Sequence, residues 1–239
     1  AFQPFDLDKF QRSGLSSKIA PTEEEQKIES LTKGLDDVKQ EFDQEVMLLL
    51  AANPVSTQKL SYKDEHSDII NELDDDQLAG RIKVSRVDNA NLIKLNKEID
   101  IKKPAIIHFV GHGEDGSIIF AGDNPRDSDE LSAKDLKNIF QRICQCYEAG
   151  EQLKIIFLNA CFSEPVAKAL SSLGLYTLGT VNKVSSVTAR RVAMQFYWKY
   201  AQSRDVIEAA KFAFSTVTTS DPNFRLFKDG QEIPLYHGN

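Results

Sequence analysis

Two reactive side chains stand where apolar runs of the sequence end. His112 lies between two glycines just after Ile106–Val110, and Cys161 closely follows Ile155–Leu158. A thiol beside an imidazole supplies the nucleophile and the general base of cysteine-dependent acyl transfer. About 50 residues separate the two, which leaves room for a hairpin and a crossover helix. The spacing predicts that neighbouring parallel strands present both side chains at one edge of a sheet.

The residues after Cys161 favour a reactive thiol. Ser163 can cap a helix that carries Pro165 in its first turn, and N–H groups at a helix start stabilise a thiolate. Each residue also has a plainer interpretation, because a strand cysteine often serves as a small apolar side chain and a lone histidine is often structural. We keep the structural interpretation for His108, which lies inside the apolar run Ile106–Val110.

From residue 45 onward, apolar runs of strand length alternate with stretches of helical periodicity. Strands are expected over Val46–Ala52, Ile82–Val87, Ala105–Val110, Ser117–Phe120, Ile155–Leu158 and Leu175–Leu178, with a hairpin at Asp229-Gly230. Helices are expected after Ser61, Ser132, Ser163 and Ser203 as N-caps, and around Leu92–Ile99 and Ala189–Tyr200. The alternation predicts a mostly parallel central sheet with helices on both faces.

Residues 1–44 differ from the rest, and we expect them to form an N-terminal helical extension to a domain spanning 45–239. They carry ten acidic and six basic side chains, more than half of the net charge of −7. Nothing in the charge pattern favours a nucleic-acid backbone, and no apolar run is long enough for a membrane span. Three cysteines and no visible signal peptide suggest a reducing, cytoplasmic setting.

Several motifs together resemble the caspase-like cysteine peptidases of clan CD. Within that clan the sequence is most similar to the CHAT family, the bacterial relatives of caspases and separase. The similarity covers about residues 45–218 and implies a caspase-like three-layer α/β sandwich. It rests on motifs that follow in order: Met47-Leu48-Leu49-Leu50-Ala51-Ala52-Asn53-Pro54, His108-Phe109-Val110-Gly111-His112-Gly113, Leu158-Asn159-Ala160-Cys161, Gly174 to Gly179 and Phe196-Tyr197-Trp198.

The resemblance implies a cysteine endopeptidase that works through a thioester acyl-enzyme, without a cofactor or metal. It makes His112 the general base and acid and Cys161 the nucleophile. The oxyanion donors would be the backbone N–H groups of Gly113 and Cys161. The substrate would be a protein or peptide, and an activating or sensor protein would gate the domain, with residues 1–44 as the candidate gate.

Substrate preference is less clear from the residues. Basic-specific relatives carry an aspartate two positions before the nucleophile, where this sequence has Asn159. Asn53, at the end of the first strand, and Asp115, after the histidine motif, are further candidates for substrate contacts. A solvated turn is the plainer interpretation of Asp115, and Asn159 could equally be a hydrogen-bonding residue at a strand end.

Two other functions stay open at this stage. The same fold with an idle dyad could serve as an interaction or scaffold domain. A small-molecule or nucleotide sensor is the third interpretation, although neither a GxGxxG nor a Walker A pattern occurs. Cys144 and Cys146 point about 200° apart on a helix, which does not suit a shared metal. The stretch 122–130 is expected to be a surface loop.

Overall fold

The central sheet of the computed structural model has seven strands in the order β10-β9-β8-β7-β3-β1-β2. The outer strands β9 (Phe224–Lys228) and β10 (Gln231–Glu232) are antiparallel and close the sheet with a hairpin. The others run parallel: β1 (Glu45–Ala51), β2 (Ile82–Asp88), β3 (Ile106–Val110), β7 (Ile155–Asn159) and β8 (Tyr176–Thr180). The predicted mostly parallel sheet is therefore confirmed.

The structure describes residues 26–27, 44–52, 62–74, 78, 80–124, 127–148, 152–217 and 223–235. The chain divides into two compact units, residues 1–42 and 43–239. Apart from Gln26, Lys27 and Gln44, the predicted N-terminal extension lies outside the described residues, and so do Asn53 and the predicted cap Ser61. Within the described segments, no helix combines the length and apolar character needed to cross a bilayer.

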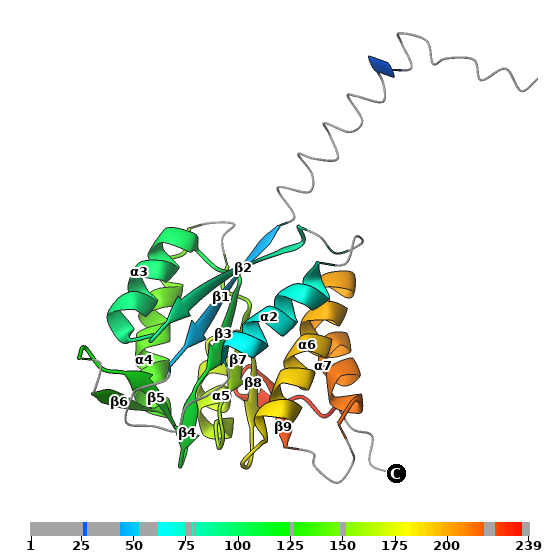
Figure 1. Ribbon diagram of the computed structural model, residues 1–239. Coiled ribbons are helices and arrows are strands. Elements are labelled where there is room, and N and C mark those ends of the chain that lie inside the picture. Colours follow the sequence, from blue (N-terminus) through cyan, green and yellow to red (C-terminus); the bar gives the residue numbers. More distant parts are fainter. Residues whose placement is uncertain are drawn as a thin grey trace, which may run out of the picture. The chain divides into compact units, whose positions relative to one another are not determined.

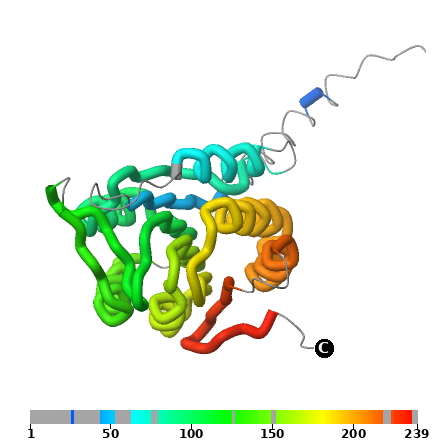
Figure 2. Tube along the Cα trace, turned by 60° about the horizontal axis from the view of Figure 1, so that its bottom comes forward, coloured from blue at the N-terminus to red at the C-terminus, as the bar shows by residue number. Residues whose placement is uncertain are grey.

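Helices cover both faces of the sheet, as Figures 1 and 2 show. One face packs against α2 (Tyr62–Leu73), α6 (Ser186–Ser203) and α7 (Val206–Ser215). The other face packs against α3 (Leu92–Lys102), α4 (Ala133–Cys144) and α5 (Glu164–Ser171). Alternation along β1 explains the two cores, because Met47 and Leu49 point into the first core and Leu48 and Leu50 into the second.

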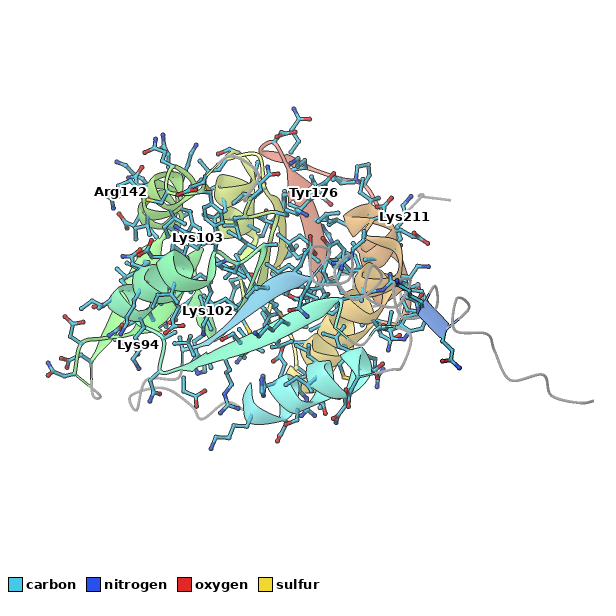
Figure 3. All side chains as sticks on the ribbon, turned by 90° about the horizontal axis from the view of Figure 1, so that it is seen from above. Lys94, Lys102, Lys103, Arg142, Tyr176 and Lys211 are labelled. Carbon is cyan, nitrogen blue, oxygen red and sulfur yellow. The ribbon has the colours of Figure 1, made fainter. Side chains whose placement is uncertain are left out.

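Lysines on α3 and at its C-cap attach this helix to its neighbours. Figure 3 shows Lys94, Lys102 and Lys103 on this side of the molecule, with Arg142 on α4 nearby and Lys211 on the opposite flank. The Lys102 ammonium hydrogen-bonds to Ser85 of β2, and that of Lys103 reaches the Cys146 carbonyl oxygen at 3.2 Å. These contacts tie α3 both to the sheet and to the end of α4.

A second, three-stranded sheet stands beside the first. Its antiparallel strands are β4 (His112–Glu114), β5 (Ser117–Ala121) and β6 (Ser128–Ser132). The expected surface loop over 122–130 is therefore wrong in its last third, because Ser128–Glu130 pair with β5. The acidic side chains there are exposed, so β6 has no alternation of buried and exposed residues that a sequence reading could detect.

Two of the predicted helix caps are corrected. Ser163 precedes α5, but its side chain makes no capping bond; instead its hydroxyl accepts the Thr180 N–H at 3.0 Å and joins β7 to β8. The N-cap of α7 is Asp205, which accepts the Ile207 and Glu208 N–H groups, whereas Ser203 is the last residue of α6. Ser132 caps α4 as expected, in a reciprocal capping box with Asp135.

Candidate active site

The chain places His112 and Cys161 beyond the carboxyl ends of two adjacent strands. β3 and β7 pair in parallel up to the Val110–Asn159 step, and the Gly111 N–H extends this pairing by donating to the Asn159 carbonyl oxygen at 3.2 Å. The chain then bends into β4, which begins at His112 and is visible next to β3 in Figure 1. Both side chains consequently reach the same edge of the central sheet.

A close approach of two backbones fixes the geometry of this edge. A Cβ atom on Gly113 would lie 2.2 Å from the carbonyl oxygen of Cys161 and 3.3 Å from Cβ of Ala160. Only a residue without a side chain fits at such a distance. The main chains of Gly113 and Cys161, the two predicted oxyanion donors, are thus in direct contact, and the glycine holds β4 against the segment with the thiol.

A small pocket of about 80 Å³ opens between the two reactive residues. Its walls come from the ends of β3 and β7, from α2, and from the start of α6. The described lining residues are Glu65, Val110, Gly111, His112, Asn159, Ala160, Cys161, Val184, Ser186, Ala189 and Arg190. A thiol, an imidazole and a cavity for a side chain are therefore found together.

The backbone turns sharply just after the thiol. Phe162 adopts a left-handed conformation, with φ of 53°, which is strained for an aromatic residue. This turn leads from β7 to α5 and leaves Cys161 half-buried at its tip. In this structure the Cys161 S–H donates to the Val184 carbonyl oxygen at 4.0 Å, so its proton is directed at the segment before α6.

A buried polar network lies directly beneath the pocket. His108 is fully buried, and its Nε2 lies 2.9 Å from Glu65 Oε1, while its Nδ1 lies 2.8 Å from the Tyr197 hydroxyl. The amide of Asn159 donates to the same Glu65 oxygen at 2.6 Å. The structural role expected for His108 therefore fits its place in the core. Glu65, by contrast, both lines the pocket and anchors this network.

The hydrogen bonds assign the protons of this network. Burial, followed by the nearby Glu65 carboxylate, raises the pKa of Tyr197 well above its usual value, so the phenol keeps its proton. His108 Nδ1 is the acceptor that the described residues offer to this hydroxyl. With Nδ1 as the acceptor, His108 carries a proton on Nε2 and donates it to Glu65.

Sequence reasoning missed Glu65, although one signal pointed to it. The stretch Lys63-Asp64-Glu65-His66-Ser67-Asp68 reads as a polar surface, but Glu65 lies four residues before Ile69 and eight before Leu73. Those two apolar residues are buried on the same stripe of α2. A carboxylate on the apolar stripe of a helix needs a partner, and His108 and Asn159 supply it.

The remaining candidates fall in different places. Asn159 lines the pocket, whereas Asp115 is exposed in the β4–β5 turn, where its φ of 46° and the following Gly116 form a tight hairpin. Burial raises the pKa of the Cys144 thiol, and Cys146 is exposed at the end of α4. Among the described residues, no three His, Cys, Asp or Glu side chains gather as a metal site requires.

Comparison with known proteins agrees with this geometry. A family model described as the CHAT domain matches residues 18–223, a range that begins within the predicted extension and includes both β3 and β7. No curated protein matches the sequence. The family match covers most of the chain, and the mixed α/β fold with its parallel central sheet is consistent with it. The chain therefore belongs to the CHAT-domain family, a caspase-like family of clan CD.

Proposed function

We propose that the chain is a cysteine endopeptidase with Cys161 as nucleophile and His112 as general base and acid. The observation that carries the proposal is the shared pocket: both side chains line it, at the carboxyl ends of adjacent strands. The close approach of the Gly113 and Cys161 main chains is a second support, because an oxyanion can bind the N–H groups of both residues only if these segments lie side by side.

The reaction follows from these groups. His112 takes the proton of Cys161, and the thiolate attacks the carbonyl carbon of the scissile peptide bond. The N–H groups of Gly113 and Cys161 stabilise the resulting oxyanion, each by about 3 kcal/mol. His112 then protonates the leaving amine, which leaves a thioester. A water molecule, deprotonated by His112, attacks this thioester and releases the free thiol and the acid product.

The direction of the thiol bond supports regulated activity. The Cys161 S–H points at the Val184 carbonyl oxygen at 4.0 Å, a weak contact, and the S–H must turn away from it before His112 can take the proton. A partner protein that moves the segment before α6 would release the thiol. We therefore place the peptidase in the cytoplasm as a gated effector acting on a protein substrate. Its three free cysteines suit a reducing compartment.

The same bond favours one alternative function. If the thiol keeps the Val184 carbonyl oxygen as its partner, the pocket binds peptides without cleaving them and the domain acts as an interaction module. Reactivity of the thiol separates the two functions, because an activated thiolate alkylates faster than an ordinary exposed thiol. Cys146, exposed and outside the pocket, is the internal reference for that comparison.

The test is cleavage of a diverse peptide library by four forms of the chain. Wild type and the matched control Cys146→Ala should cleave the same peptides. Cys161→Ala and His112→Ala should lose at least about 10³-fold in rate. Cleavage that survives Cys161→Ala would refute the proposal. A wild-type chain that cleaves nothing, and in which Cys161 alkylates no faster than Cys146, would favour the interaction module.

A further inference from the structure

We propose that the pocket beside Cys161 selects a side-chain carboxamide, glutamine or asparagine, at the residue before the cleaved bond. Glu65 would accept hydrogen bonds from the amide nitrogen, and Arg190 would donate to the amide oxygen. This inference rests on the proposed function, since it treats the pocket as the site for that substrate residue. It assigns substrate selection to Glu65 of α2 and Arg190 of α6, two residues that lie outside the sequence motifs.

Glu65 presents one unpaired oxygen. Its side chain is only 4% exposed, and its Oε1 accepts from both His108 and Asn159. For Oε2, the structure shows no partner among the described residues, yet this oxygen is not one of the fully buried unsatisfied atoms. A carboxylate held on one side by two donors therefore offers its other oxygen to the pocket that it lines.

Arg190 offers the complementary donor edge. Its Nη1 lies 3.4 Å from Asp64 and 3.5 Å from Asp68, two carboxylates on the outer side of α2. Its Nε is buried and has no acceptor in the part of the chain that the structure describes. An unsatisfied buried donor costs about 1–3 kcal/mol, which a substrate oxygen would offset once the guanidinium turns to present Nε to the pocket. The Nε edge of a guanidinium is well suited to such an oxygen.

The two groups line one pocket without neutralising each other. Within the described residues, Glu65 and Arg190 form no ion pair, because Glu65 pairs with His108 and Arg190 with Asp64 and Asp68. Each charged group has its partners outside the pocket, and both residues line the same pocket. A ligand with a donor and an acceptor on one small planar group can satisfy both at once.

Other side chains satisfy only half of this pocket. A lysine pairs with Glu65 but is repelled by the positive charge of Arg190. An aspartate pairs with Arg190 but is repelled by the negative charge of Glu65. Leucine, which has nearly the shape of asparagine, leaves both polar groups without partners. A site built to hydrogen-bond a polar substrate group strongly rejects an analogue that lacks it. The small volume of about 80 Å³ also suits a short side chain.

Asn159 gains a clear role in this arrangement. Its amide donates to Glu65 at 2.6 Å, so the anionic group that position 159 lacks is supplied by Glu65 and held in place by Asn159. Asn159 is then a positioning residue, since it acts on the substrate through Glu65. His108 is its counterpart from β3 and fixes the same oxygen at 2.9 Å.

Binding to the chain with Cys161→Ala tests the pocket apart from the chemistry. The probes are capped tetrapeptides, acetyl-Ala-Ala-X-Ala-amide, with asparagine, glutamine, aspartate, leucine or lysine at X, titrated by calorimetry or NMR. The asparagine or glutamine peptide should bind at least about tenfold more tightly than the other three. Equal binding of all five, tighter binding of lysine, aspartate or leucine, or no binding at all would overturn the proposal.

Two charge-removing variants sharpen the result. Arg190→Met should shift the preference to lysine by about tenfold, and Glu65→Gln should shift it to aspartate. Arg191→Met is the matched control, because Arg191 is exposed on the same helix and does not line the described pocket. Should the buried Glu65→Gln change prevent folding, the Arg190→Met result decides, and an unchanged preference there counts against the proposal.

Cleavage by the intact chain distinguishes the two proposals. A peptide that binds selectively to the Cys161→Ala chain but is never cut by wild type contradicts the endopeptidase and leaves the carboxamide pocket standing. Cleavage that is dependent on Cys161 but occurs after lysine, aspartate or leucine contradicts the pocket assignment and leaves the endopeptidase standing.

Discussion

Two glutamates, the partly buried Glu45 and the buried Glu65, mark the opposite ends of the sheet, and their bonding differs. Glu45 begins β1 at the amino end; its Oε1 accepts from Lys154 at 2.5 Å, and its Oε2 accepts from Arg204 at 2.6 Å and Tyr200 at 2.9 Å. Glu65, near the carboxyl end, uses only Oε1 for internal bonds. The first carboxylate is saturated by the protein itself, whereas the second keeps an oxygen for a ligand.

This difference separates stability from function. A buried carboxylate with both oxygens paired contributes to a fixed packing, and breaking it leaves charged partners without a counterpart. Burial and the neighbouring Glu45 raise the pKa of Tyr200 far above its usual value, so this hydroxyl stays a donor. At the other end, unpaired atoms on Glu65 and Arg190 represent stability that the fold gives up at the pocket.

The largest effect is expected from a methyl group at the carboxyl end. Gly113→Ala brings Cβ into the Cys161 carbonyl oxygen, 2.2 Å away, so one of the two backbones must move. Unfolding free energy should fall by about 3 kcal/mol and peptide cleavage by about 100-fold. Urea denaturation and cleavage rates measure the two effects.

Gly174→Ala is the matched control for this change. Its Cβ would meet nothing within 4 Å, and its φ of 82° alone should reduce stability by about 1 kcal/mol. Gly174 precedes β8, so cleavage should be unaffected. An active, fully stable Gly113→Ala chain would show that the two backbones are not held together as described.

The second largest effect is expected from removing the charge of Glu45 at the amino end of the sheet. Glu45→Gln leaves Arg204 and Lys154 facing an amide in place of a carboxylate, and we expect a loss of about 2 kcal/mol in unfolding free energy. The preference among peptides should not change, because Glu45 is remote from the pocket lining. Chemical denaturation and peptide binding measure these outcomes, and a changed peptide preference would contradict the separation of the two ends.

Sequence patterns were sufficient for the fold because its elements are encoded locally. Strands β1, β3 and β7 follow apolar runs such as Leu48-Leu49-Leu50, and β2 follows the spaced apolar residues Ile82, Val84 and Val87. The cap of α4 follows from Ser132 and the residues just after it. The placement of His112 and Cys161 at one edge of the central sheet could also be predicted from the sequence, since it depends only on strand direction and order.

The remaining features depend on contacts distant in sequence. Glu65 meets His108 and Asn159 only after α2 packs on the sheet, so its helix alone reads as polar. Ser163 fits a local capping pattern, but Thr180 on the next strand competes for its hydroxyl and prevails. Arg190 joins the pocket through the register of α6, which no local motif specifies.

A third prediction concerns pH and the network under the pocket. Tyr197→Phe removes the donor to His108 Nδ1 and should cost about 1–2 kcal/mol near pH 7. The raised pKa of Tyr197 means that the folded state holds its proton more tightly than the unfolded state. The stability that this group contributes is therefore present below about pH 10 and is lost as the pH rises further.

Denaturant midpoints of wild type and Tyr197→Phe at pH 7 and above pH 10 test this. The difference in denaturant midpoint between wild type and Tyr197→Phe should be smaller at the higher pH. Tyr200 has a raised pKa in both proteins, so its contribution cancels in the difference. A difference in midpoint that grows with pH would contradict the assignment of Tyr197 as a neutral donor.

The smallest effect is expected at Lys154, the most exposed partner of Glu45. Lys154 is 48% exposed, and its ammonium contacts one oxygen of Glu45, whereas Arg204 and Tyr200 hold the other. Exposed ion pairs contribute little because water and salt screen them. Lys154→Met should lower unfolding free energy by no more than about 0.5 kcal/mol. Thermal denaturation at low and high salt measures it, and a loss close to that of Glu45→Gln would mean that Lys154 is an essential partner in the cluster.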